Sequence, residues 1–124
     1  MSNILIVDDD VTMTGLLETL LKMEGHTTTV VNDSTKAIQV ADSVNPDLIT
    51  LDLMMPKLSG FELCEQLQQD PRFVQIPILI VSAKHDPESK ERAIRAGAKA
   101  YVTKPFHIDE LLQRIQALTR AQHS

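Results

Sequence analysis

Apolar residues along this chain fall into five short runs, each rich in Ile, Val, Leu or Thr and bounded by Asp, Asn, Pro or Gly. Such runs are typical of β-strands. The predicted strands are residues 3–7, 27–31, 48–51, 76–81 and 100–102. The first, third and fourth runs are almost wholly apolar instead of alternating, which indicates strands that are buried on both faces. Parallel sheets have this pattern because helices cover both of their faces.

The segments between these runs carry apolar residues at the spacing of amphipathic helices. In the last segment, for example, Ile108, Leu111 and Ile115 recur at intervals of three and four residues. Capping signals set the expected bounds of the helices. The predicted helices run from Thr12 to a stop at Gly25, from Ser34 to Val44, onward from a capping box at Ser59 and Glu62, from Pro87 to a stop at Gly97, and onward from Ile108.

Strand and helix alternate five times, without a linker, a repeat or a low-complexity segment between them. This alternation, with right-handed crossovers, predicts an α/β fold in which a doubly wound parallel sheet lies between two layers of helices. Residues 1–124 are expected to form one domain of this kind. In such folds, reactive residues gather at the carboxyl ends of the strands.

Reactive side chains follow four of the five predicted strands. Asp8 and Asp9 come directly after the first strand, and Asp52 follows the third. Ser82 follows the fourth strand, and Lys104 comes soon after the fifth. Because the strands are expected to be parallel, these acids, the hydroxyl and the amine are expected to meet at one edge of the sheet.

Carboxylates crowded at one edge repel one another unless a cation neutralises them. Carboxylate oxygens suit Mg²⁺ as ligands, whereas Zn²⁺ favours His or Cys. A carboxylate beside Mg²⁺ can act as a nucleophile toward phosphorus, and a lysine and a hydroxyl can stabilise the charge on the transferring phosphoryl oxygens. Asp10, the third acid of the first run, is interpreted as a helix cap or a solvated acid outside this site.

Composition narrows the class of protein. A net charge of −5 and an aromatic content of 3% do not favour a dedicated nucleic-acid surface. No apolar run approaches the roughly 20 residues of a membrane helix, and no signal-peptide pattern opens the chain. The one cysteine, Cys64, permits no internal disulfide and is interpreted as a core residue. We therefore expect a soluble, cytoplasmic protein without direct contact to nucleic acid or membrane.

Five segments together resemble the receiver domains of two-component response regulators. They are residues 4–10 (ILIVDDD), 47–56 (DLITLDLMMP) with Gly60 after it, 81–83 (VSA), 96–98 (AGA) and 101–106 (YVTKPF). They occur in the family's order and spacing and extend over essentially the whole chain. The resemblance implies a flavodoxin-like (βα)5 three-layer sandwich with the strand order 2-1-3-4-5.

The resemblance also implies roles for single residues. Asp52 corresponds to the phosphoacceptor, which receives the phosphoryl group from a phosphohistidine. The implied Mg²⁺ ligands are Asp8, acting mainly through water, Asp9, Asp52 and the backbone carbonyl of Met54. Lys104 corresponds to the ammonium group that binds the phosphoryl group.

The resemblance further implies a conformational switch. Ser82 stands at the family's Ser/Thr switch position and also contacts the phosphoryl group, and Tyr101 stands at the aromatic switch position coupled to it. Phosphorylation of Asp52 would draw Ser82 inward, let Tyr101 follow and change the face formed by the fourth helix, the fifth strand and the fifth helix. The bond between Lys104 and Pro105 is expected to be cis, as in the relatives.

The implied function is that of a phosphoacceptor switch in a two-component phosphorelay. Such a domain assists its own phosphorylation and dephosphorylation but turns over no separate substrate. Its partners would be a sensor histidine kinase or a phosphotransfer protein, and a downstream output domain or protein. A phosphorylation-dependent homodimer is left open: Glu110 and Arg114 match the charged dimer face of winged-helix regulators, whereas Lys99 and Ala100 depart from it.

Three other interpretations are considered, and the residues argue against two of them. The chain could be a receiver cut from a larger transcription regulator or a hybrid kinase. A haloacid-dehalogenase-like phosphatase also uses an Asp after a strand but needs a second acid two residues later, where this chain has Met54. A flavin module of the same fold class needs a Gly- and hydroxyl-rich phosphate loop after the first strand, where this chain has three acids.

Overall fold

The computed structural model describes the backbone of residues 2–123 and the side chains of residues 2–120. Its strands are β1 (Asn3–Val7), β2 (Thr27–Val31), β3 (Leu48–Leu51), β4 (Ile78–Ser82) and β5 (Ala100–Thr103). Its helices are α1 (Val11–Met23), α2 (Ala37–Val44), α3 (Gly60–Gln69), α4 (Pro87–Arg95) and α5 (Ile108–His123), with a short 3₁₀ helix η1 (Ser34–Lys36) before α2.

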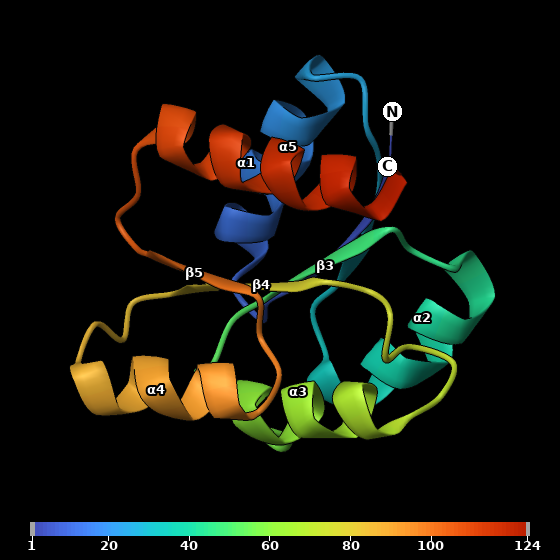
Figure 1. Ribbon diagram of the computed structural model, residues 1–124. Coiled ribbons are helices and arrows are strands. Elements are labelled where there is room, and N and C mark those ends of the chain that lie inside the picture. Colours follow the sequence, from blue (N-terminus) through green and yellow to red (C-terminus); the bar gives the residue numbers. More distant parts are fainter. Residues whose placement is uncertain (1, 124) are drawn as a thin grey trace.

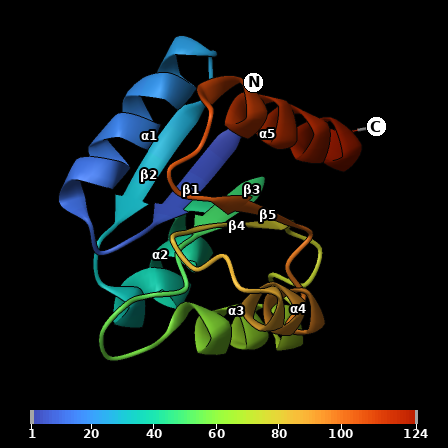
Figure 2. The same cartoon turned by 90° about the vertical axis from the view of Figure 1, so that its left-hand side faces the viewer.

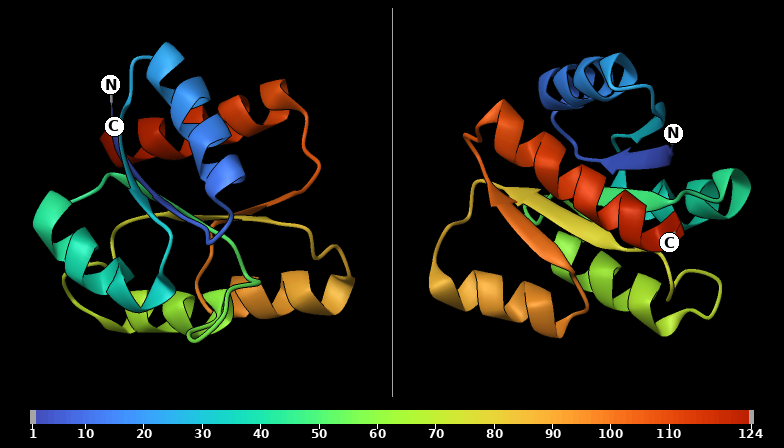
Figure 3. Two further views of the ribbon diagram at one scale, coloured as in Figure 1. Left: turned by 180° about the vertical axis from the view of Figure 1, so that it is seen from behind. Right: turned by 45° about the horizontal axis from the view of Figure 1, so that its top comes forward.

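The strands form one sheet in the order β2-β1-β3-β4-β5, and every neighbouring pair is parallel. Helices α1 and α5 cover one face of the sheet, and α2, α3 and α4 cover the other (Figure 1). Figure 2 and Figure 3 show the same two helical layers from other sides. This architecture confirms the predicted fold class and strand order.

The core consists of two apolar layers, one on each face of the sheet. Beneath α1 and α5 lie the side chains of Ile4, Ile6, Leu17, Leu21, Leu48, Leu79, Val81, Val102, Leu111 and Ile115. On the other face, Leu5, Val7, Ile49, Leu51, Ile78 and Ile80 pack toward α2, α3 and α4. Successive side chains of a strand point to opposite faces, which explains why the central strands are continuously apolar.

Three predicted strand bounds were wrong. Strand β4 begins at Ile78 rather than at residue 76, because Pro77 has no N–H to give to the sheet. The amide of Ile76 instead donates to the carbonyl oxygen of Phe73, 2.9 Å away, in the preceding turn. The strand ends one residue later than predicted, so that Ser82 belongs to it, and β5 likewise extends to Thr103.

The predicted helix over residues 34–44 is divided. Its first turn is the 3₁₀ helix η1, because the carboxylate of Asp33 accepts hydrogen bonds from both the amide and the hydroxyl of Thr35. The α-helix begins only at Ala37 and ends at Val44, and its C-terminal cap is Asn45, whose φ of 48° is left-handed.

The predicted helix caps are confirmed. Asp10 caps α1 by accepting hydrogen bonds from the amides of Thr12 and Met13. Of the two interpretations of this acid, the helix cap is therefore the correct one. Ser59 and Glu62 form the predicted capping box of α3. In the described part of the chain, no helix combines the length and the apolar character that crossing a bilayer requires.

At Gly60 the start of α3 comes close to the backbone that follows β3. Its amide donates to the carbonyl oxygen of Leu53, 3.0 Å away. A Cβ atom at this position would lie 2.1 Å from the carbonyl oxygen of Asp52 and 2.5 Å from the Cα of Leu53. Only a residue without a side chain therefore lets α3 begin directly against the backbone of Asp52.

We expect alanine at two glycines to have opposite effects. Gly60→Ala should lower the free energy of unfolding by about 1–3 kcal/mol, because the backbone must move to admit the methyl group. Gly15→Ala, at an exposed position in α1 with nothing within 4 Å of the added Cβ, should raise it by about 1 kcal/mol. Urea unfolding of both variants measures the two changes, and equal changes would contradict this packing.

Cys64 is a core residue, as predicted, and is fully buried in α3. Its Sγ lies 3.6 Å from the carbonyl oxygen of Ala96, where α4 ends. Burial, and to a lesser degree the charge of Glu65, raises the pKa of the Cys64 thiol from its ordinary 9.0 to about 11. The folded protein therefore keeps this thiol protonated and inert.

Above about pH 9 the unfolded chain loses a thiol proton that the folded chain retains up to about pH 11. Stability should therefore fall over this interval more in the wild type than in Cys64→Ala. At neutral pH, an aromatic disulfide reagent should modify Cys64 only as fast as the protein unfolds. Rapid modification of the folded protein would show that the thiol is accessible.

Candidate functional site

The carboxyl edge of the sheet carries the predicted reactive residues, because the hydrogen-bond ladder continues past the strand ends. The amide of Asp8 donates to the carbonyl oxygen of Val31, and that of Asp52 to the carbonyl oxygen of Val7, both at 3.1 Å. The amide of Lys104 donates to the carbonyl oxygen of Ser82, 2.8 Å away. The sheet therefore fixes the backbone at each of these positions.

Asp8, Asp9 and Asp52 form an acidic cluster, in which one carboxylate oxygen of each residue lies within 4.8 Å of those of the other two. Asp8 and Asp52 are buried, whereas Asp9 is exposed. The charge of Asp52 makes it harder to ionise Asp8, because like charges in a partly buried site are poorly screened.

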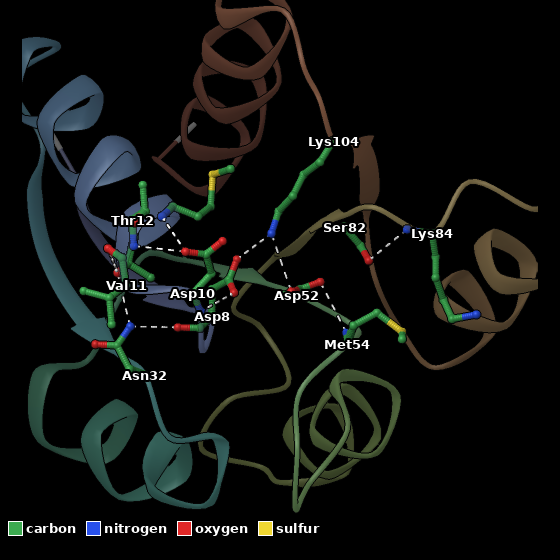
Figure 4. A network of polar contacts seen from close by, with 12 residues as sticks. Asp8, Asp10, Val11, Thr12, Asn32, Asp52, Met54, Ser82, Lys84 and Lys104 are labelled. Carbon is green, nitrogen blue, oxygen red and sulfur yellow. Dashed lines mark hydrogen bonds and ion pairs between the residues drawn. The ribbon is translucent and has the colours of Figure 1, made fainter.

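Lys104 lies between the two buried acids. Its Nζ is 2.7 Å from Oδ2 of Asp8 and 3.5 Å from Oδ2 of Asp52. The three side chains are 14%, 3% and 8% exposed, respectively. The ammonium group therefore pairs most closely with Asp8 and leaves the charge of Asp52 only partly compensated (Figure 4).

The pKa directions at this site follow from burial and from the charges of the neighbouring side chains. Burial and the charge of Asp52 raise the pKa of Asp8, although hydrogen bonds from Lys104 and from the amide of Asp10 oppose the change. Burial alone would lower the pKa of Lys104, but its hydrogen bond to Asp8 and the charges of Asp52 and Asp8 outweigh burial and raise it. The lysine is firmly charged, and one ammonium group does not neutralise the acids.

The main chain of Met54 lies beside Asp52, because its amide donates to Oδ1 of Asp52 at 3.3 Å. The Met54 side chain is exposed, so the position contributes its backbone and no charged group.

Ser82 and Tyr101 both contact the loop after β4. The hydroxyl oxygen of the buried Ser82 accepts a hydrogen bond from the amide of Lys84 at 3.3 Å. The hydroxyl of Tyr101 donates to the carbonyl oxygen of the same Lys84. Partial burial is the main reason why the pKa of Tyr101 is raised, so its hydroxyl stays protonated. The peptide bond between Lys104 and Pro105 is cis, as the resemblance predicts.

Asn32 also belongs to this region, although no sequence pattern pointed to it. Its side-chain amide donates to the carbonyl oxygen of Asp8 at 2.8 Å and to the hydroxyl of Thr14 at 3.1 Å. The three residues come from the ends of β2 and β1 and from α1, so periodicity could not bring them together.

The donor set of the acidic cluster fits Mg²⁺. All three side chains offer oxygen atoms, and the cluster contains no His or Cys that would favour Zn²⁺. The cluster also carries more negative charge than Lys104 compensates, which a divalent cation would relieve. Asp8, Asp9 and Asp52 are thus the residues that could hold the ion.

A protein-family model described as the response regulator receiver domain matches residues 4–116 of the chain. The DNA-binding dual master transcriptional regulator RpaA of Synechocystis is 40% identical over 120 residues, which are 97% of this chain and 50% of RpaA. The response regulator ArlR of Staphylococcus epidermidis is 39% identical over 122 residues, which are 98% of this chain and 54% of ArlR. The chain thus spans about half the length of these curated relatives.

Solved structures share the fold. A putative response regulator from Chloroflexus aurantiacus superimposes with a TM-score of 0.91 at 32% identity, over 96% of this chain and 98% of that one. The chemotaxis protein CheY4 of Vibrio cholerae superimposes with a TM-score of 0.89 at 27% identity, over 95% of this chain and 98% of that one.

Proposed function

This chain belongs to the response regulator receiver domain family, and on that premise we propose that Asp52 is its phosphoacceptor. The observation that carries the proposal is the position of the Asp52 carboxylate. It is buried at the carboxyl end of β3, within 4.8 Å of two other acids, and 3.5 Å from the ammonium group of Lys104. A nucleophile, a cation-binding cluster and a fixed positive charge therefore meet at one point.

The proposed reaction is a phosphoryl transfer. A carboxylate oxygen of Asp52 attacks the phosphorus of a phosphohistidine, the phosphorus–nitrogen bond breaks, and an acyl phosphate forms on Asp52. Lys104 and the hydroxyl of Ser82 bind the phosphoryl oxygens. When bound by Asp8, Asp9, Asp52 and the carbonyl of Met54, Mg²⁺ would supply charge neutralisation at these oxygens. The protein assists this step on itself and turns over no separate substrate.

The phosphorylated domain acts as a switch. A phosphoryl group on Asp52 competes with Asp8 for Lys104, and it offers the Ser82 hydroxyl a charged acceptor. The hydroxyl of Ser82 accepts a hydrogen bond from the amide of Lys84, and the hydroxyl of Tyr101 donates to the carbonyl oxygen of the same residue. A movement of Ser82 therefore shifts the loop to which Tyr101 is hydrogen-bonded. The face formed by α4, β5 and α5 changes with them. A partner binds one of its two conformations, and phosphorylation raises the population of that conformation.

The proposed partners follow from the family. A sensor histidine kinase or a phosphotransfer protein supplies the phosphoryl group, and an output domain or protein binds the switched face. Residues 1–124 act as one receiver domain in the cytoplasm, and phosphorylation-dependent pairing of two copies is one form of output. The family assignment sets aside the phosphatase and the flavin module as alternatives.

Intact-protein mass spectrometry after treatment with acetyl phosphate tests the proposal. With Mg²⁺, the wild type and Asp42→Asn, a surface acid on α2 paired with Arg72, should each gain one phosphoryl group. Asp52→Ala, and the wild type in EDTA, should gain none. An adduct that persists in Asp52→Ala would place the phosphoacceptor elsewhere, and an adduct formed equally in EDTA would contradict the metal site.

A further inference from the structure

Asp9 is held differently from the other two acids. Asp8 and Asp52 are buried, and Lys104 lies within 3.5 Å of both. Asp9 is exposed, and its side chain has no hydrogen bond or ion pair to any residue that the structure describes. The backbone alone therefore sets where its carboxylate can reach.

The peptide unit between Asp8 and Asp9 is the part of the backbone that matters most. A peptide unit is planar, so the direction of its carbonyl bond, together with the position of the Cα atom before it, fixes the orientation of the plane and the path to the next Cα atom. Asn32 holds that carbonyl oxygen at 2.8 Å. On the other side of Asp8, its amide donates to the carbonyl oxygen of Val31 at 3.1 Å. The chain leading to Asp9 is therefore fixed at both peptide units of Asp8.

Chemistry determines the orientation of the Asn32 amide. A main-chain carbonyl only accepts hydrogen bonds, so the NH₂ group of Asn32 must face Asp8. The hydroxyl of Thr14 donates to the carbonyl oxygen of Val11 at 3.1 Å, so it accepts the second N–H of Asn32 at 3.1 Å. Thr14 is buried in α1, and it holds the amide against Asp8. In Figure 4, dashed lines join the Asn32 amide to Asp8 and to a side chain of α1.

We propose that Asn32, supported by Thr14, is a positioning residue for the Mg²⁺ site: it orients the peptide unit that presents Asp9 to the ion. This inference rests on the proposed function, because it requires that the acidic cluster binds Mg²⁺. Removing a residue that hydrogen-bonds and orients a metal ligand typically weakens metal binding about 10- to 100-fold.

Asn3 provides a matched control, because it makes the same kind of contact at the opposite end of β1. Its side-chain amide donates to the carbonyl oxygen of Val44 at 2.7 Å. Asn32→Ala and Asn3→Ala therefore each remove one asparagine bond to a main-chain carbonyl. Calorimetric titration of the EDTA-treated proteins with MgCl₂ should show about 10- to 100-fold weaker binding for Asn32→Ala and unchanged binding for Asn3→Ala. Equal affinity in the wild type and Asn32→Ala would overturn the inference.

A second pair of variants leaves Asn32 in place. Thr14→Ser keeps the hydroxyl that accepts from Asn32 and should bind Mg²⁺ like the wild type, whereas Thr14→Val should bind it more weakly. In acetyl phosphate reactions, Asn32→Ala should need more Mg²⁺ for the half-maximal rate but reach the wild-type rate at saturation. If Asn32 had only a structural role, Asn32→Ala would lower the melting temperature without changing the Mg²⁺ concentration needed for the half-maximal rate.

The two proposals fail in different ways. A wild type that does not bind Mg²⁺ contradicts the metal site and, with it, this inference. A wild type that binds Mg²⁺, together with unchanged affinity in Asn32→Ala and Thr14→Val, overturns the role of Asn32 alone.

Discussion

The contact of the Lys104 ammonium group with Asp8 and Asp52 is the interaction on which the site depends. It places one positive charge, 2.7 Å from one carboxylate and 3.5 Å from another, against a cluster of three acids. Burial is the main reason why the pKa of Asp8 is raised, and the charge of Asp52 adds to it. The pKa of Lys104 is raised despite its burial, because the hydrogen bond to Asp8 and the charges of Asp52 and Asp8 favour the ammonium form. Removing a charged group from water is costly unless its charge is compensated, so this edge of the sheet is destabilised in a way that a cation relieves. Binding sites commonly trade stability for function in this manner.

The fold concentrates this charge as a direct consequence of its topology. Strands buried on both faces carry no charged side chain along their length, and parallel strands all end at the same edge. The acids therefore follow directly after β1 and β3, Ser82 is the last residue of β4, and Lys104 follows directly after β5. Gly60 then brings the start of α3 against the backbone of Asp52. The capping box of Ser59 and Glu62 fixes that helix end, so the loop after β3 has little freedom beside the acidic cluster.

Much of this arrangement was predictable from the sequence, because apolar runs that end abruptly in Asp8, Asp52 and Lys104 mark both the strands and the edge where they end. The sequence did not reveal which acid lies nearer to Lys104, since side-chain packing decides that distance. It also missed Asn32, a single polar residue in a loop, whose contact with Asp8 spans 24 positions. The bounds of β4 and α2 were wrong because Pro77 and the Asp33 cap act locally and leave apolar periodicity unchanged.

The central claim is that excess negative charge at the carboxyl edge is the structural basis of the site. Urea unfolding of the wild type and Asp52→Asn, in MgCl₂ and in NaCl of equal ionic strength, tests it most directly. In NaCl, Asp52→Asn should be the more stable protein, because it removes one of the negative charges that Lys104 leaves uncompensated and keeps the ion pair between Lys104 and Asp8. MgCl₂ should stabilise the wild type according to its affinity for the ion and should stabilise Asp52→Asn much less. A less stable Asp52→Asn in NaCl, together with no difference between the two salts for the wild type, would contradict the claim.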